Sequence, residues 1–158
     1  MPAGKIRIGV ISDTHGLLRP EAIEALAGVD RILHLGDIGE IEILAALECV
    51  APVTAIRGNV DTQGPCSQFP DFETVEVAGH SLYLLHNPAA LDLNPVAAGF
   101  SAVLYGHTHQ PKIEEKFGVL YFNPGSAGPR RFRLPVTVGF LTTSAGSSLL
   151  AEIFPLLD

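Results

Sequence analysis

Residues Lys5–His15 read KIRIGVISDTH and pass abruptly from apolar to polar side chains. Its β-branched apolar run predicts a buried strand, and Asp13 and His15 come directly after that strand. Because alternate residues of an extended chain share a face, we expect both side chains to point to the same side. This stretch therefore predicts a core strand that presents two metal-competent side chains at its carboxyl end.

The segments after this strand alternate between helical and strand patterns. Pro20–Ala27 and Glu40–Val50 carry apolar residues at helical spacing, whereas Arg31–Gly36 and Val53–Gly58 are apolar runs of strand length. The order strand, helix, strand, helix, strand is typical of a parallel sheet with right-handed crossovers.

Hairpin signals dominate the chain after Asp61. Turns that separate short apolar runs are expected at residues 78–81, 117–118 and 144–147. A loop over residues 62–71, a short helix at Asn94–Ala98 and a buried strand at Ser101–Gly106 complete the pattern. We therefore expect an α/β fold with two sheets packed face to face and helices outside, as one domain over residues 1–158.

Composition narrows the functional classes. The chain of 158 residues is 47% hydrophobic with a mean hydropathy of +0.30, which excludes a disordered protein. Its 10 Lys and Arg against 17 Asp and Glu give a net charge of −7, so we expect neither dedicated nucleic-acid binding nor an anionic-membrane partner. The uncharged segment Leu134–Ala151 contains Pro135 and polar residues and predicts two strands, not a membrane span.

The cysteines indicate a reducing compartment. Cys49 and Cys66 form no CxxC pair and match no zinc-site spacing, so we expect reduced thiols. The run after Arg7 is too short for the apolar core of a secretory signal. Both observations predict a cytoplasmic protein.

Metal-competent side chains follow each of five strand-like runs. The carboxyl ends of strands in α/β sheets are where ligands collect, so these side chains are expected to meet. Together they offer carboxylate, amide and imidazole donors, a set that suits a pair of ions such as Mn²⁺, Fe²⁺, Ni²⁺ or Zn²⁺. The candidates are Asp13, His15, Asp37, Asn59, His86, His107 and His109.

The spacing of these residues makes coincidence a poor explanation. With 16 glycines and 6 histidines in the chain, Gly-His-x-His is expected by chance roughly 0.02 times. The alternative is that the residues are ordinary polar groups at strand ends, with Asn59 a turn residue and His86 a hydrogen-bonded core histidine. His34 lies inside an apolar run and is interpreted as a satisfied core or supporting residue.

The ordered set Asp13-x-His15, Gly36-Asp37, Gly58-Asn59-x-Asp61, His86 and Gly106-His107-x-His109 resembles the calcineurin-like metallophosphoesterase superfamily. The length, His34-x-Gly-Asp37 and Asn123-Pro-Gly-Ser126 look like its small bacterial and archaeal phosphodiesterase branch. The resemblance implies a four-layer αββα sandwich with two mixed sheets, and a dinuclear metal site. By position, the first ion would be held by Asp13, His15, Asp37 and His109, and the second by Asp37 as the shared carboxylate, Asn59, His86 and His107.

The function that this resemblance implies is a two-metal-dependent phosphodiesterase or phosphatase acting on a small phosphoester. Two such ions would share a hydroxide that attacks phosphorus, with Mn²⁺ as the expected metal. Asp37, Asn59 and Asp61 are the catalytic candidates, with Asp61 orienting a neighbouring ligand. Val60 stands where many relatives carry a proton-donating histidine, which predicts a preference for activated esters and diesters.

Several points stay open at the level of sequence. The substrate could be a cyclic nucleotide, a phospholipid-derived diester or a nucleic-acid end, and Arg130, Arg131 or Asn123 could contact it. A homodimer is the commonest assembly for such a protein. The alternative function is a metal-binding protein-interaction scaffold that resembles the retromer subunit of this fold. A zinc-dependent amide or β-lactam hydrolase would show a His-x-His-x-Asp-His run, which this sequence lacks.

Overall fold

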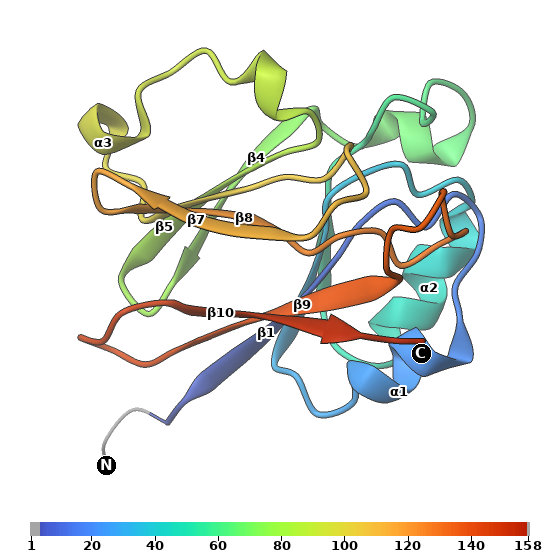
Figure 1. Ribbon diagram of the computed structural model, residues 1–158, viewed down its shortest axis with the longest axis horizontal. Coiled ribbons are helices and arrows are strands. Elements are labelled where there is room, and N and C mark those ends of the chain that lie inside the picture. Colours follow the sequence, from blue (N-terminus) through green and yellow to red (C-terminus); the bar gives the residue numbers. More distant parts are fainter. Residues whose placement is uncertain (1–3, 158) are drawn as a thin grey trace.

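Two five-stranded sheets lie face to face in the computed structural model, which describes residues 4–157 (Figure 1). The strand order is β10-β9-β1-β2-β3 in the first sheet and β4-β5-β6-β8-β7 in the second. Both sheets are mixed: three neighbouring strands are parallel in each, and the other two strands are added through antiparallel pairings. The predicted face-to-face pair of mixed sheets is therefore confirmed.

The first sheet contains the predicted alternation of strands and helices. Its parallel strands are joined by helices α1 and α2, which cover its outer face (Figure 1). The hairpin expected around residues 144–147 adds the two antiparallel strands. The elements are β1 (Ile6–Ile11), α1 (Pro20–Ala25), β2 (Arg31–His34), α2 (Ile41–Glu48), β3 (Val53–Ala55), β9 (Thr137–Thr143) and β10 (Leu150–Pro155).

The second sheet is built from the two other predicted hairpins and one buried strand between them. The loop expected at 62–71 contains a short 3-10 helix, and Asn94 caps α3 by accepting from two backbone N–H groups. The elements are η1 (Pro65–Gln68), β4 (Phe72–Val77), β5 (His80–Leu85), η2 (Pro88–Ala90), α3 (Pro95–Ala98), β6 (Ala102–Leu104), β7 (Lys112–Lys116) and β8 (Val119–Asn123).

The central strands are buried on both faces, which explains their nearly continuous apolar sequences. In β1, Ile8 and Val10 face the second sheet, whereas Ile11 faces α1 and α2. Phe122 of β8 is fully buried between the sheets. Among the described residues, α3 and the loop around it cover the outer face of the second sheet, so this outermost layer is thin.

Within the described part of the chain, no helix has both the length and the apolar character that a membrane span requires.

The packing between the sheets gives a first testable prediction. Phe122→Ala should lower the free energy of unfolding by about 3–5 kcal/mol, because it empties a fully buried site between the two sheets. Phe117→Ala, in the turn of the same hairpin, is the matched control, since Phe117 is 94% exposed. Urea unfolding of both variants measures the difference. Equal unfolding midpoints would contradict this account of the core.

Candidate metal centre

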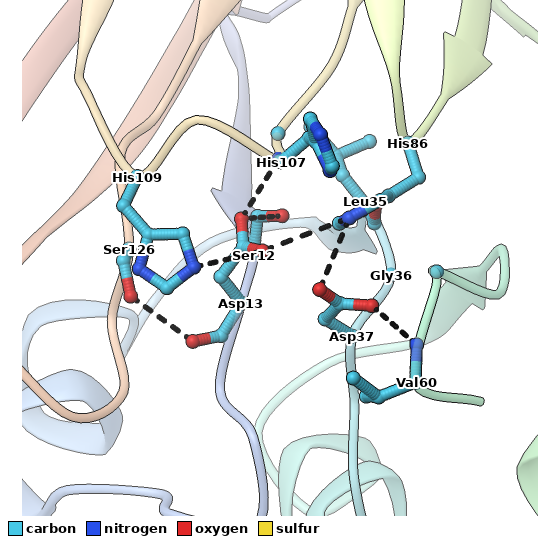
Figure 2. Close-up of polar contacts among 12 residues, drawn as sticks. Ser12, Asp13, Leu35, Gly36, Asp37, Val60, His86, His107, His109 and Ser126 are labelled. Carbon is cyan, nitrogen blue, oxygen red and sulfur yellow. Dashed lines mark hydrogen bonds and ion pairs between the residues drawn. The ribbon is translucent and has the colours of Figure 1, made fainter. Parts of the chain in front are cut away.

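The carboxyl ends of strands from both sheets meet at one edge of the sandwich. Asp13 and His15 follow β1, and Asp37 follows β2. His86 follows β5, and the loop after β6 carries His107 and His109. Backbone hydrogen bonds tie these ends together, from Asp13 N–H to the Gly36 carbonyl (3.0 Å) and from Gly106 N–H to the His86 carbonyl (3.0 Å). Figure 2 shows the His109 ring directed toward Asp13 and the His86 ring directed toward Asp37.

The backbone at these positions is not extended, contrary to our expectation for Asp-x-His and His-x-His. Left-handed φ angles of 47–73° occur at Asp13, His15, Asp37, His107 and His109. These five account for most of the eight non-glycine residues with positive φ among residues 4–157. Such conformations are sparsely populated by non-glycine residues and cluster at functional sites. The side chains therefore converge because each loop turns sharply, not because alternate residues of a strand share a face.

The ring nitrogens surround one oxygen of each carboxylate. Asp13 Oδ1 lies 3.4 Å from His109 Nε2 and 3.7 Å from both His15 Nε2 and His86 Nε2. Asp37 Oδ2 lies 3.2 Å from His86 Nε2 and 3.4 Å from His15 Nε2. Among the described residues, two groups could each hold a metal ion: Asp13, His15 and His109, and Asp13, Asp37 and His86.

Several donor atoms of this cluster are buried without a hydrogen-bond partner: Asp13 Oδ1, His15 Nε2, His86 Nε2 and His109 Nδ1. Buried polar atoms are normally satisfied, and each exception calls for an explanation such as a bound ion. Carboxylate oxygen and imidazole nitrogen are donors that borderline divalent cations accept. The residues present therefore fit divalent metal ions.

The other oxygen of each carboxylate is fixed by the protein. Asp13 Oδ2 accepts from Ser12 Oγ (2.8 Å) and from the N–H of His107 (3.1 Å). Asp37 Oδ1 accepts from the N–H of Val60 (3.0 Å). Each carboxylate is thus oriented so that a single oxygen faces the centre.

The electrostatics keep both carboxylates ionised. Burial by itself would raise the pKa of Asp13, but His109 and His15 hold that pKa well below its usual range. Burial likewise opposes ionisation of Asp37, yet His86 and the Val60 N–H lower its pKa. In return, Asp13 raises the pKa of His15, and Asp37 raises that of His86 against the effect of burial. The carboxylates are therefore ionised ligands, and a bound cation would take the place of the protons that they favour on His15 and His86.

The remaining predicted residues lie around this cluster. The buried Asp61 accepts from the N–H groups of Ile38 (3.0 Å), Gly39 (3.1 Å) and Gly58 (2.9 Å), so it ties the loop after β2 to the loop after β3. Both of its oxygens are occupied by backbone groups, which agrees with an orienting role.

Asn59 and His107 lie at the margin of the cluster. His107 lies outside both three-residue groups of the described chain, and its ring meets that of His86 edge-on at a centroid distance of 5.3 Å. Asn59 is exposed and borders a cavity together with His86.

Glycines precede the ligands where backbone must approach closely. A Cβ on Gly58 would lie 2.2 Å from Asp37 Oδ1, and one on Gly106 would lie 2.1 Å from Ser12 Oγ. Any side chain at these two positions would displace the carboxylates or their supports.

Sequence reasoning missed most of the supporting network. The fully buried His34 accepts from Gly36 N–H at Nδ1 (3.1 Å), so Nε2 carries the proton and donates to Thr14 Oγ1 (3.0 Å). Thr14 in turn donates to the Ile38 carbonyl (2.8 Å). His34 is thus a satisfied core residue, as predicted, but its bracing of the loops after β1 and β2 has no sequence signal.

Asn123 and Ser126 also brace the centre. Asn123 Nδ2 donates to the Gly106 carbonyl (3.1 Å) and to Thr108 Oγ1 (3.0 Å), on either side of His107. Ser126 Oγ donates to the Asp13 carbonyl (3.0 Å). The buried Asn123 side chain is therefore occupied by the ligand loop.

Comparison with known proteins agrees with this geometry. The calcineurin-like phosphoesterase superfamily domain matches residues 6–146. A "probable metallophosphoesterase" of Methanothermobacter thermautotrophicus is 37% identical over 92% of this chain and 90% of its own length. A phosphodiesterase of Methanocaldococcus jannaschii is 28% identical over 87% of this chain and 93% of its own. The solved structure of Vacuolar Protein Sorting 29 from Cryptosporidium parvum superposes with a TM-score of 0.83 at 20% identity, covering 98% of this chain and 93% of its own.

The buried His34 ring predicts a loss of stability in acid. Burial lowers the pKa of His34 from 6.5 to about 4, so the unfolded chain takes up this proton first as the pH falls. The contribution is complete above about pH 7 and is lost between about pH 6.5 and pH 4. Between pH 7.5 and pH 5 it should amount to about 2 kcal/mol of unfolding free energy.

Denaturant unfolding of the wild type and His34→Gln at both pH values checks this. The variant should lose less stability on acidification than the wild type. Comparing the two proteins isolates His34, because the raised pKa values of His15 and His86 act with the opposite sign in both. An identical pH dependence would refute the assignment of a neutral, braced His34.

Proposed function

This chain belongs to the calcineurin-like phosphoesterase superfamily and is a metal-dependent phosphoesterase, and we propose that it hydrolyses phosphodiesters at the strand-end centre. The observation that carries the proposal is the cluster of buried, unpartnered oxygen and nitrogen atoms around Asp13 and Asp37. Two ionised carboxylates in one buried site, both within 3.7 Å of the same His15 and His86 nitrogens, require positive charge to balance them.

We propose that two divalent ions occupy this centre, with Asp37 as the shared ligand. Its Oδ2 lies within 3.4 Å of His15, assigned to the first ion, and within 3.2 Å of His86, assigned to the second. In this proposal Asp13, His15 and His109 complete the first set, and Asn59, His86 and His107 complete the second. The oxygen and nitrogen donors accept several borderline metals, of which we propose Mn²⁺ as the first to test.

When bound, such a pair of ions supplies Lewis-acid stabilisation of the phosphoryl oxygens and makes water an effective nucleophile near neutral pH. The chain's own residues provide the rest. Asp13 and Asp37 stay ionised, Ser12 and the Val60 N–H fix their outward oxygens, and Asp61 holds the loop that carries Asp37.

Val60 determines which leaving groups can depart. Its side chain is 52% exposed beside Asp37 and cannot donate a proton. A positioned general acid typically contributes about 10²–10⁴ in rate when the leaving group is poor. Substrates whose leaving group departs unaided are therefore favoured, which supports activated esters and diesters over alkyl phosphates.

The scaffold alternative receives less support. The likeness to Vacuolar Protein Sorting 29 is below 25% identity and shows the fold alone. A relative that is itself named a phosphodiesterase matches 87% of this chain. A cytoplasmic location remains part of the proposal and is supported by the free thiols of Cys49 and Cys66.

Asp37→Ala tests the shared carboxylate. The metal-stripped wild type should hydrolyse bis(p-nitrophenyl) phosphate only after a divalent ion is restored, and Mn²⁺, Ni²⁺, Mg²⁺ and Zn²⁺ are compared. Asp37→Ala should lose at least about 10³-fold in kcat/KM, because loss of the shared ligand disrupts both ions. Bound metal is counted in parallel by elemental analysis.

The control is Asp30→Ala, which removes an exposed carboxylate at the opposite, amino-terminal end of β2. This control should retain wild-type turnover and metal content. Normal turnover in Asp37→Ala would refute the shared-ligand assignment. Full metal loading without hydrolysis in the wild type would favour the scaffold.

Val60→His tests the account of the leaving group. The imidazole restores a possible proton donor, so kcat/KM for alkyl phosphates should rise about tenfold or more, while nitrophenyl esters should change little. The exposed position of Val60 makes the substitution structurally tolerable. An equal rise in kcat/KM for both classes of ester, or no rise for either, would show that the missing proton donor at position 60 does not limit hydrolysis.

A further inference from the structure

A cavity of about 460 Å³ opens directly beside the metal centre. Two of its lining residues, Asn59 and His86, belong to the proposed ligand set of the second ion. Phe72 and Leu85 also line this cavity. A group attached to a phosphate at the centre would therefore have immediate access to this space, whose volume lies in the range of small-molecule sites.

Phe72 gives the cavity an aromatic wall. It begins β4 and pairs in register with Leu85, the residue before His86, so it stands at the same sheet edge as the centre. Its ring is stacked on Tyr83 with centroids 5.9 Å apart and an interplanar angle of 16°. The side chain is nevertheless 42% exposed. A large aromatic ring is thus held in a fixed orientation and left uncovered next to a metal centre.

An ion pair and further hydrogen bonds of Arg57 connect the two chain segments that border this cavity. Arg57 Nε donates to Asp71 Oδ1 (2.7 Å), and Arg57 Nη1 donates to the Ser67 carbonyl (3.2 Å). The backbone N–H of Arg57 also donates to the Pro70 carbonyl (3.0 Å). These contacts tie the loop after β3 to the segment that enters β4. The wall that carries Phe72 is therefore preorganised relative to Asn59.

We propose that this cavity binds a planar aromatic group attached to the substrate's phosphate, with Phe72 stacking on it. This inference rests on the proposed function, because the phosphate must lie at the metal centre. An exposed ring backed by Tyr83 offers a flat surface for stacking, and the apolar side chains of Leu85 and Ala90 complete the wall. The substrate class is then aryl or nucleoside phosphodiesters.

The polar rim distinguishes this site from a simple alkyl pocket. Asn59, Thr62 and Asn87 line the cavity alongside the apolar residues. Amide and hydroxyl groups can hydrogen-bond to the edge of a heteroaromatic ring, whereas an alkyl chain would leave them unpaired. An aliphatic, lipid-derived substituent is therefore the alternative that the experiment must separate.

Phe72→Trp provides a direct reporter of stacking. The chain contains no tryptophan, so the variant has a single indole fluorophore at the proposed contact. In the Mn²⁺-loaded protein, AMP and phenyl phosphate should quench its emission, whereas methyl phosphate and hexyl phosphate should not. Stronger quenching at lower concentration by AMP than by phenyl phosphate would identify a nucleoside, and the reverse an aryl group.

Calorimetric titration of Phe72→Ala provides the second measurement. Its affinity for AMP should fall about tenfold, the effect expected when one stacking partner is removed, while its affinity for methyl phosphate should stay unchanged. Phe117→Ala is the matched control, because Phe117 is an exposed phenylalanine in the β7–β8 turn and does not line this cavity. It should leave both affinities at the wild-type value.

The inference is overturned if Phe72→Ala lowers the affinities for AMP and methyl phosphate equally. It is also overturned if hexyl phosphate binds the wild type as tightly as AMP does and its affinity falls as much in Phe72→Ala. Hydrolysis of bis(p-nitrophenyl) phosphate by the same Mn²⁺-loaded wild type distinguishes failure of the aromatic site from failure of the proposed function. Hydrolysis without selective AMP binding rejects the aromatic site and leaves the proposed function standing. Absence of both metal binding and hydrolysis rejects the proposed function itself.

Discussion

The arrangement of this protein depends on two ionised carboxylates buried at one edge between its sheets. Asp13 and Asp37 each direct one oxygen into a cluster of imidazole nitrogens. Burying such charges without compensation is strongly unfavourable. In a chain of net charge −7, most of the acidic residues remain in water, but Asp13, Asp37 and Asp61 are buried. Backbone N–H groups occupy both oxygens of Asp61, whereas Asp13 and Asp37 each direct an oxygen into the centre. A cation bound between these carboxylates would compensate their buried charge.

The surrounding chain is organised to hold those oxygens in place. Backbone N–H groups and the Ser12 hydroxyl fix the outward oxygens, and Asp61 and His34 join the ligand loops to one another. Left-handed backbone at five ligand positions adds local strain that the rest of the structure must offset. The two extended sheets with cores on either side of the first sheet supply that rigidity. The packing of the sheets thus offsets the strain that orients the ligands at this one edge.

The elements and the site differ in how far the sequence predicts them. Continuous apolar runs and turn residues identify the strands because the central strands are buried on both faces, and Asn94 before Pro95 marks α3 because it caps the helix. The metal-competent residues are found because each one follows a strand.

The reason for their convergence is not visible in the sequence, since the left-handed turns at Asp13 and His107 occur at non-glycine residues. The bonds from His34 to Thr14 and from Asn123 to Thr108 join residues distant along the chain, so no local pattern reports them. The cavity wall at Phe72 depends in the same way on the register of β4 against β5.

Two features beside the centre point to the same kind of substrate by independent routes. Val60 offers no proton, so a leaving group must depart as a stabilised anion, which an aryl oxide does more readily than an alkoxide. Phe72 offers a fixed aromatic surface within reach of the same phosphate. The first feature constrains the chemistry of bond cleavage and the second constrains binding. An aryl ester satisfies both, because its ring also carries the departing oxygen. A nucleoside satisfies only the stacking condition, since its ester oxygen leaves as a sugar alkoxide, and an aliphatic substituent satisfies neither.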